Sequence, residues 1–481
     1  MPADDGSNIA IVSDLHLSMG YNPRTGAYER REDFFYDGVF AHFLDDLQAR
    51  AAREGRKWRL VILGDVFDFL QVDLNLEGKV AAPLDRSTPT TLARMDVIAR
   101  GHPEFFEALG RFVAAGFPLD VLPGNHDIEM IRPSSQEHFK RLLVQASGKE
   151  EAAAGVTFYP WIYYIPGVVY AEHGQQYDDE NSFTTVMEPY PPDDAANREA
   201  IDQPLGSYFV EYLYNYIEPI DPFADNIKPS SRYILWALRA HPVLALSTMG
   251  EHFRLFTKVL GHTGELSAAQ VDQRRQTYRE QVLRPYAAEL GLGYDTVVAI
   301  DKMAAVPAMS SKMGQLEVLV GNPLRHLAPT LAALVALFVS LRRTRGMKRS
   351  FLLFAVALAA LARRERRDAH PATQRMGYLQ RAAGQIHAQL QKEQKAVPLY
   401  VFGHTHKAEQ FPVGGDDPAP HYINSGTWTP LVPDPYDLLA TRDRFTLVQI
   451  TRDTATGASV SRLMFWNDAS GRPDMLPLMT G

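Results

Sequence analysis

The sequence predicts an α/β protein built around a largely parallel sheet. Short apolar runs at Ile9–Ser13, Trp58–Leu63 and Pro118–Leu122 have the length of buried strands. Two segments with helical spacing of apolar residues, Phe34–Arg53 and Thr91–Ala115, lie between them. Strands that alternate with helices are typical of βαβ units, whose strands run parallel.

The rest of the chain adds strands and a long helical stretch. Val156–Tyr159 and Ile162–Ala171 are predicted to pair with each other as strands. The later strands, which we expect to complete a second sheet, are Pro398–Phe402, His421–Asn424, Phe445–Thr451 and Ser459–Trp466. Helical patterns between the two groups cover Ser230–Leu260, Ser267–Leu290 and Gln374–Gln394. Prolines 103, 242 and 285 are predicted to break or kink the helices that contain them.

Five short polar motifs follow strand-like runs, in a fixed order along the chain. They are Asp14-Leu15-His16, Gly64-Asp65-Val66-Phe67-Asp68, Gly124-Asn125-His126-Asp127, Glu172-His173-Gly174 and Gly403-His404-Thr405-His406. Asp, Asn and His are ligands that suit Mn, Fe, Zn or Mg. Ligands at the carboxyl ends of strands are expected in an α/β site. Because residues i and i+2 of an extended chain point to one side, Asp14 and His16 are predicted to hold one ion, and His404 and His406 are predicted to lie on the same side of the chain.

The order and wording of these motifs resemble the calcineurin-like metallophosphoesterase family, over residues 8–180 and 397–467. The resemblance implies a four-layer α/β/β/α sandwich. It implies hydrolysis of a phosphoester or phosphoanhydride by metal-activated hydroxide. Two divalent cations are expected as cofactors, with Mn first and Fe, Zn or Mg as alternatives. Cations about 3.5–4 Å apart can clamp a phosphoryl group between them.

The same resemblance assigns a role to each matching position. Asp65 is expected to bridge the two cations. His126 is the expected catalytic residue that faces the leaving group, and Asp68 is expected to orient it. The remaining positions form a first-cation set, Asp14, His16 and His406, and a second-cation set, Asn125, His173 and His404. His126 favours the general phosphatase and phosphodiesterase branches over relatives that carry Arg at this position.

The spacing of the motifs predicts a large insertion. His173 and His404 are 231 positions apart, far more than any other neighbouring pair of motifs. We therefore expect residues 181–396 to form a mostly helical insertion or cap. Within it, residues 324–367 contain two apolar stretches, Leu327–Leu341 and Phe351–Ala362. At about 1.5 Å rise per residue, each stretch is too short to span a hydrocarbon core about 30 Å thick.

Basic residues surround the apolar stretches. Residues 342–367 hold nine Lys or Arg against one acid, although the whole chain has a formal net charge of −8. This charge pattern favours a hairpin that lies on an anionic membrane surface over nucleic-acid binding. Burial inside the insertion and a true membrane span remain alternatives. A membrane-docked hairpin also suggests a lipid-linked phosphorylated substrate, as in the bacterial UDP-2,3-diacylglucosamine pyrophosphatases of this family.

Composition bounds the remaining possibilities. The absence of cysteine excludes disulfides, thiolate zinc sites and thiol catalysis. The first residues lack a signal peptide, so we expect a cytoplasmic protein on the inner membrane face. One alternative is a soluble phosphatase or phosphodiesterase acting on nucleotides or phosphoproteins. Another is an inactive scaffold, although all seven expected ligand positions match. The sequence carries no signal for the oligomeric state.

Overall fold

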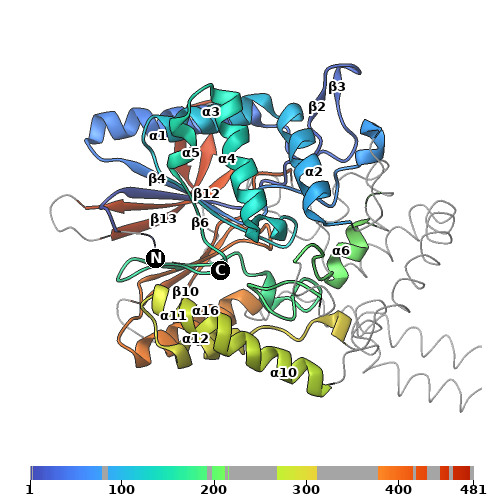
Figure 1. Cartoon of the computed structure of the whole chain (residues 1–481). Coiled ribbons are helices and arrows are strands. Elements are labelled where there is room, and N and C mark those ends of the chain that lie inside the picture. Colours follow the sequence, from blue (N-terminus) through green and yellow to red (C-terminus); the bar gives the residue numbers. More distant parts are fainter. Residues whose placement is uncertain are drawn as a thin grey trace, which may run out of the picture.

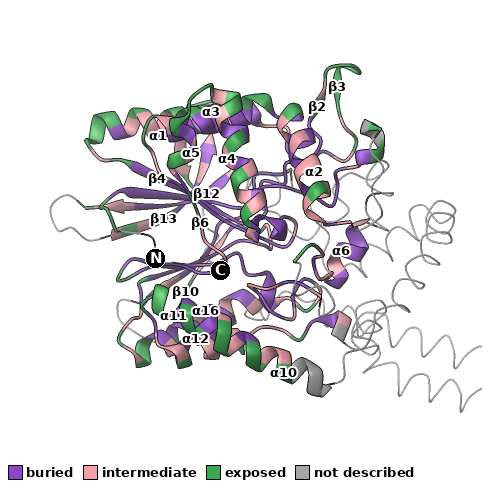
Figure 2. Cartoon of the chain, in the orientation of Figure 1, coloured by how far each residue is buried: buried purple, intermediate pink, exposed green. Residues whose placement is uncertain are grey.

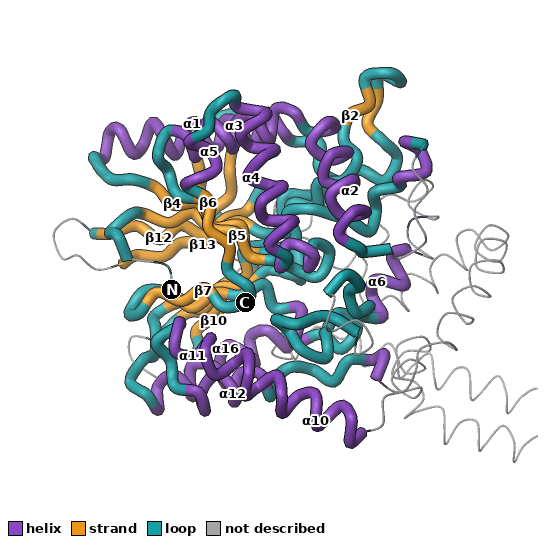
Figure 3. Tube along the Cα trace, in the orientation of Figure 1, coloured by secondary structure: helices purple, strands orange, loops and turns teal. Residues whose placement is uncertain are grey.

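Two β-sheets lie face to face in this mixed α/β protein, with helices on their outer sides (Figure 1). The computed structural model describes residues 2, 4–78, 85–191, 198–211, 215, 268–310, 377–414, 419–430, 445–453 and 459–476. A short ribbon of β2 (Tyr21–Asn22) and β3 (Ala27–Tyr28) projects from the first half of the chain. Figure 3 shows the strands enclosed between the two groups of helices.

The first sheet has seven strands in the order β14-β13-β12-β1-β4-β5-β6. Its parallel half consists of β1 (Asn8–Val12), β4 (Trp58–Leu63), β5 (Leu119–Leu122) and β6 (Val156–Phe158). Its antiparallel half consists of β12 (Thr446–Arg452), β13 (Ser459–Asn467) and β14 (Arg472–Met475). The predicted parallel sheet is therefore present, but over only half of this sheet.

The second sheet has five strands in the order β10-β11-β9-β8-β7. They are β7 (Tyr163–Ile165), β8 (Val169–Ala171), β9 (Leu399–Phe402), β10 (Glu409–Pro412) and β11 (His421–Asn424). Strands β8, β9 and β11 run parallel, and an antiparallel strand lies at each edge. The carboxyl ends of β8 and β9 therefore lie together.

Helices cover the outer face of each sheet. Those on the first sheet are α1 (Asp37–Glu54), α2 (Thr88–Gly101), α3 (Pro103–Ala114), α4 (Pro133–Ser147) and α5 (Glu151–Ala154). Those below the second sheet are α10 (Ala268–Tyr278), α11 (Arg284–Glu289), α12 (Tyr294–Asp301) and α16 (Tyr378–Lys392). The short α6 (Leu205–Phe209) lies apart from both groups.

The central strands are apolar on both faces because both faces are covered (Figure 2). Along β1, Ile9 and Ile11 pack between the sheets, whereas Ala10 and Val12 pack against helices. Along β4, Val61 likewise packs against the second sheet. This alternation follows from the two-residue period of a strand. It explains why these strands are continuous apolar runs in the sequence.

Two predicted strand pairings are wrong. Strand β6 pairs with β5, and the run from residue 162 to 171 forms its own hairpin, β7–β8, in the second sheet. Of the strands predicted to complete the second sheet, β11 joins it, but β12 and β13 belong to the first sheet, where β12 pairs antiparallel with β1. Both errors have one cause. Local patterns define a strand, but its neighbour is decided by contacts between distant parts of the chain.

The helices of the predicted insertion pack on the second sheet. Residues of α11, α12 and α16 share one hydrophobic cluster with Tyr170, Tyr400 and Phe402 of that sheet. The break predicted at Pro285 takes the form of a wider π-helical turn, Arg279–Leu283, just before it. A π turn accommodates the hydrogen bond that proline cannot make, so the chain stays helical.

Two predictions lie outside the described residues. They are the helix at Ser230–Leu260 and the apolar, basic hairpin at 324–367. The predicted docking of this hairpin on a membrane surface therefore also lies outside the described residues. In the part of the chain that the structure describes, no helix combines the length and apolarity needed to cross a membrane.

Candidate metal centre

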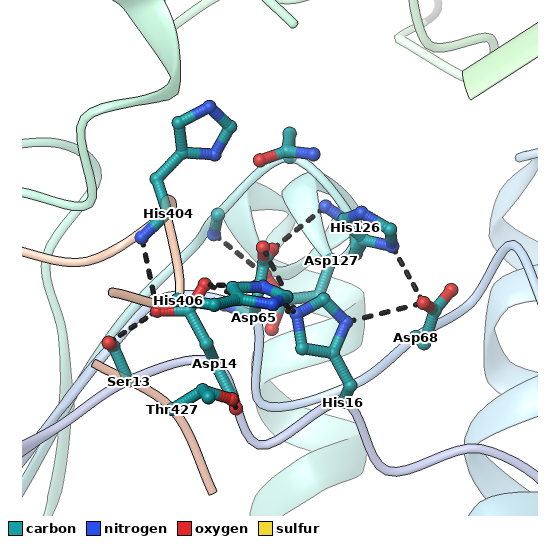
Figure 4. Close-up of polar contacts among 12 residues, drawn as sticks. Ser13, Asp14, His16, Asp65, Asp68, His126, Asp127, His404, His406 and Thr427 are labelled. Atoms are coloured by element: carbon teal, nitrogen blue, oxygen red, sulfur yellow. Dashed lines mark hydrogen bonds and ion pairs between the residues drawn. The ribbon is translucent and has the colours of Figure 1, made fainter. Parts of the chain in front are cut away.

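All nine predicted site residues follow carboxyl ends of strands at one edge of the two sheets. Three parallel strands of the first sheet lead into them, β1 before Asp14 and His16, β4 before Asp65 and Asp68, and β5 before Asn125 and His126. Two parallel strands of the second sheet do the same, β8 before His173 and β9 before His404 and His406. The fold thus brings the five motifs together, as Figure 4 shows for most of their side chains.

The backbone of this site is strained. Five of the predicted ligands adopt the left-handed region, with φ between 51° and 69°: Asp14, His16, Asp65, His404 and His406. Among the described residues, only three other non-glycine residues do so. A left-handed residue with a side chain costs about 1–2 kcal/mol, and such strain concentrates at functional sites. The chain therefore gives up stability to direct these side chains inward.

This backbone corrects one part of the sequence reasoning. Asp14 and His16 do approach the same partner, since His406 Nε2 lies 3.3 Å from Asp14 Oδ1 and 3.0 Å from His16 Nε2. They do not do so by the alternation of an extended strand, because β1 ends at Val12 and both residues have positive φ. A tight turn directs them together instead.

The first predicted set converges with acceptor atoms facing one another. His16 Nδ1 lies 3.3 Å from Asp68 Oδ2. An ionised carboxylate only accepts hydrogen bonds, so Nδ1 carries the proton and Nε2 presents its lone pair. That Nε2 faces His406 Nε2 at 3.0 Å and Asp14 Oδ1 at 3.9 Å. A cation relieves the repulsion among such atoms.

The second predicted set has the same character. His173 Nδ1 donates to the Leu63 carbonyl at 2.8 Å, which leaves Nε2 to face Asp65 Oδ2, 3.1 Å away. The ligand atoms of Asp65, His173 and His404 all lie within 4.8 Å of one another. The same holds for Asp14, His16 and His406, and for His16, Asp65 and His126. Asp65 therefore belongs to two groups, one of which shares His16 with the first predicted set, so Asp65 lies between the two sets.

Unsatisfied atoms test whether cations fit this site. Asp14 Oδ1, Asn125 Oδ1 and His173 Nε2 are buried, and within the described residues none of them has a hydrogen-bond partner. A buried polar atom without a partner is costly and needs an explanation. All three belong to predicted ligands, one in the first set and two in the second. The residues present thus fit a pair of divalent cations.

Glycines make room for this arrangement at two motifs. A Cβ at Gly64 would lie 2.3 Å from His173 Nδ1, and the φ of 88° at Gly64 also disfavours a side chain. A Cβ at Gly124 would lie 2.1 Å from Asp65 Oδ1. Only glycine permits such close approach. Both motif glycines therefore pack directly against predicted ligands.

The buried carboxylates and histidines of the site shift one another's pKa values. Burial would raise the pKa of Asp65, but His173 and His126 outweigh it and hold the pKa well below its usual range. Burial would lower the pKa of His173, but Asp65 and Asp14 raise it to about 9. The pKa of His16 is likewise raised well above its ordinary value, by Asp14 and Asp68 against the effect of burial. The site thus attracts positive charge strongly.

His126 lies beside the ligands with its side chain partly exposed. Its Nδ1 lies 2.7 Å from Asp68 Oδ2, and its backbone N–H donates to Asp65 Oδ1 at 2.8 Å. Asp68 is held in turn by the N–H groups of Leu70 and Gln71. The same Asp68 oxygen also contacts His16, a link that the sequence reasoning missed.

Several bracing residues were not predicted. Asp127 accepts N–H groups from Gly124, Val66 and Phe67 and so joins two motif loops. Burial and the charge of Asp65 raise the pKa of Asp127 to about 7. Thr427 Oγ1 donates to the Asp14 carbonyl at 2.7 Å. Asp127 belongs to one of the five motifs, whereas Thr427 belongs to none of them.

No protein-family model matches this chain, and no curated protein matches it either. Any assignment of function to this chain therefore rests on the geometry of the candidate site.

Proposed function

We propose that this chain is a dimetal-dependent phosphoesterase of the calcineurin-like class, which hydrolyses a phosphoester or phosphoanhydride. One observation carries the proposal. Asp65 belongs to two adjoining groups of ligand atoms, and within the described residues buried atoms of both predicted sets lack hydrogen-bond partners. Two cations that share one carboxylate account for all of these features at once.

The fold supports the same class. Three hydrophobic clusters lie between successive layers. The first lies between helices and the first sheet, the second between the two sheets, and the third between the second sheet and further helices. They support the four-layer α/β/β/α sandwich that the family resemblance implies. In such a sandwich, the parallel strands of both sheets direct their carboxyl ends to one edge, and the candidate site occupies that edge.

The residues fall into two proposed roles, metal ligands and a proton donor. Asp14, His16 and His406 would hold the first cation, and Asn125, His173 and His404 the second, with Asp65 between them. When bound, the cations would supply Lewis-acid polarisation of a phosphoryl group and a water of lowered pKa. The fixed hydrogen bonds of His16 and His173 keep these rings in the tautomers that ligation requires.

His126 would act on the leaving group. Asp68 accepts the Nδ1 proton of His126, so the ring is fixed with Nε2 as its second functional atom. Its backbone N–H is bonded to Asp65, which keeps the ring beside the shared ligand. The side chain of His126 is 13% exposed and can meet a substrate from solvent. It would hold a proton at Nε2 and transfer it to the departing oxygen.

Metal-dependent hydrolysis tests this proposal. The purified chain is stripped with EDTA, reloaded with Mn²⁺, and assayed on a phosphomonoester, a phosphodiester, a nucleotide pyrophosphate and a lipid pyrophosphate in anionic vesicles. Asp65→Asn should reduce any activity about a thousand-fold, because a bridging ligand contributes several kcal/mol to the reaction. Asp96→Asn is the matched control, since Asp96 also pairs with a histidine, His138, but on α2 and α4.

Three results would count against the proposal. The first is absence of Mn²⁺-dependent activity on the whole panel. The second is Asp65→Asn as active as the wild type. The third is equal loss in Asp65→Asn and Asp96→Asn, which would trace the effect to general charge removal.

A further inference from the structure

A chain of hydrogen bonds outside the predicted ligand set joins Asn125 to His404. Asn125 Nδ2 donates to Asn181 Oδ1 at 3.4 Å, and Asn181 Nδ2 donates to Asp178 Oδ2 at 2.9 Å. The same Asp178 oxygen lies 3.0 Å from His404 Nε2. Two second-set ligands from opposite ends of the sequence are thus connected through one loop, which follows η3 (Gln175–Tyr177).

This chain of hydrogen bonds decides which atom of His404 and of Asn125 faces the proposed cation. Asp178 can only accept, so the His404 proton lies on Nε2 and the lone pair lies on Nδ1. A ligating histidine commonly donates its other ring N–H to a carboxylate in this way. At Asn125, the hydrogen bond from Nδ2 to Asn181 fixes the amide, so Oδ1 remains as the atom that can bind a cation. This Oδ1 is buried and has no hydrogen-bond partner in the part of the chain that the structure describes.

Asp178 is built to hold its position. Its Oδ1 accepts the N–H of Glu180 at 3.1 Å, and its backbone carbonyl accepts the N–H of Ser182 at 2.8 Å. Its side chain is 13% exposed, against 2% for His404. Within the described residues, Asp178 belongs to none of the three groups of clustered ligand atoms. It therefore contacts the site through His404 and, by way of Asn181, through Asn125.

We propose that Asp178 and Asn181 are a positioning pair that orients His404 and Asn125 for the second cation. The inference rests on the proposed dimetal function. The same short loop begins beside His173, the third ligand of that set. One segment of the chain thus starts after one ligand of the second set and is hydrogen-bonded to the other two.

Metal binding by the full chain tests the pair. EDTA-stripped protein is titrated with Mn²⁺ by calorimetry, and the two sites are assigned with His406→Ala, which removes a first-set ligand. Asp178→Ala should weaken the second site about 10- to 100-fold. The first site should stay within about twofold. Asp178→Asn keeps an acceptor oxygen and should recover part of the loss.

A double-mutant cycle separates one unit from two independent residues. Asn181→Ala should also weaken the second site. Because the two side chains act through one chain of bonds, Asp178→Ala with Asn181→Ala should lose less than the product of the single losses. Asp96→Asn, which removes the carboxylate of the His138 pair, should bind both ions as the wild type does.

Each contrary result has a distinct meaning. An unchanged second site in Asp178→Ala overturns the inference and leaves the proposed function intact. Equal weakening of both sites, with a lower melting temperature of the stripped variant, also overturns it, because the loop would then be a general structural support. A wild type that binds fewer than two ions overturns the proposed function and the inference with it.

Discussion

Two groups of buried histidine and carboxylate side chains in this protein have opposite characters. His102 lies at the junction of α2 and α3, with Nδ1 2.9 Å from Asp37 and Nε2 3.2 Å from Glu32. His173 lies in the candidate site, 3.1 Å from Asp65. In both cases nearby carboxylates outweigh burial and raise the pKa, to about 10 for His102 and about 9 for His173.

The two groups differ in how completely their hydrogen bonds are made. Both nitrogens of His102 meet carboxylate oxygens, and Glu32 also accepts N–H groups from Gly20 and Phe34. In the candidate site, His173 Nε2 lacks a hydrogen-bond partner among the described residues, and Asp65 has a left-handed backbone. A buried histidine beside a carboxylate is therefore not enough to mark a metal site. Unsatisfied atoms and strain distinguish the site from a complete structural cluster.

The largest effect that separates the two groups should come from His126. His126→Asn should lower kcat on the order of 10³-fold, because it removes the proton donor beside Asp68. The number of Mn²⁺ ions bound should stay at two. His138→Asn removes the histidine of the exposed pair with Asp96 and should leave kcat unchanged. A variant that loses metal together with activity would show that His126 is a ligand instead.

Removing the structural histidine should act on stability instead of chemistry. His102→Gln leaves Glu32 and Asp37 without their shared partner, and loss of one member of a buried ion pair costs about 3 kcal/mol. Urea unfolding of the EDTA-stripped protein measures this cost. Below its lowered melting temperature the variant should still bind two Mn²⁺ ions. Loss of ion binding there would contradict the separation of the two groups.

The pH dependence of stability should carry the signature of the same histidine. Its pKa is about 10 in the folded protein, against an ordinary value of 6.5. The folded state thus binds the proton more tightly than the unfolded state does. The stabilisation is complete below about pH 6.5 and is lost as the pH rises toward 10. Over this range, stripped wild type should lose more stability than His102→Gln. Parallel profiles would refute the assignment.

The smallest effect should come from the support of the first ligand set. Thr427→Val keeps the shape of the side chain but removes the hydrogen bond to the Asp14 carbonyl and two hydrogen bonds with Thr429. Each such bond is worth about 1 kcal/mol, so urea unfolding should show a loss of about 1–3 kcal/mol. Affinity for Mn²⁺ should fall only a few-fold, and only at the first site. A larger loss at the second site would contradict the division of the ligands into two sets.

Local elements of this fold were predictable because the sequence expresses them directly. The strand predicted at Trp58–Leu63 has the same bounds as β4, since a strand covered on both faces is a continuous apolar run. Pro103 separates α2 from α3 as expected, because its ring fits only the first turn of a helix. The pairing of β12 with β1 was not predictable, because it joins segments more than 400 positions apart.

The candidate site divides in the same way. Its residues were singled out by their motifs, and the structure brings all of them to one edge of the two sheets. Their left-handed backbone was not predictable, because residues other than glycine rarely adopt this conformation. Asp178 and Asn181 were missed because they belong to no motif. Only the fold brings them to His404 and Asn125.

The most direct test of the central claim is electron paramagnetic resonance of the full chain loaded with Mn²⁺, together with its metal content. Two cations that share Asp65 should give two ions per chain and a spin-coupled spectrum, because bridged ions lie about 3.5–4 Å apart. In Asp65→Asn the coupled spectrum should disappear. A wild type with one isolated ion, or with none, would contradict the account.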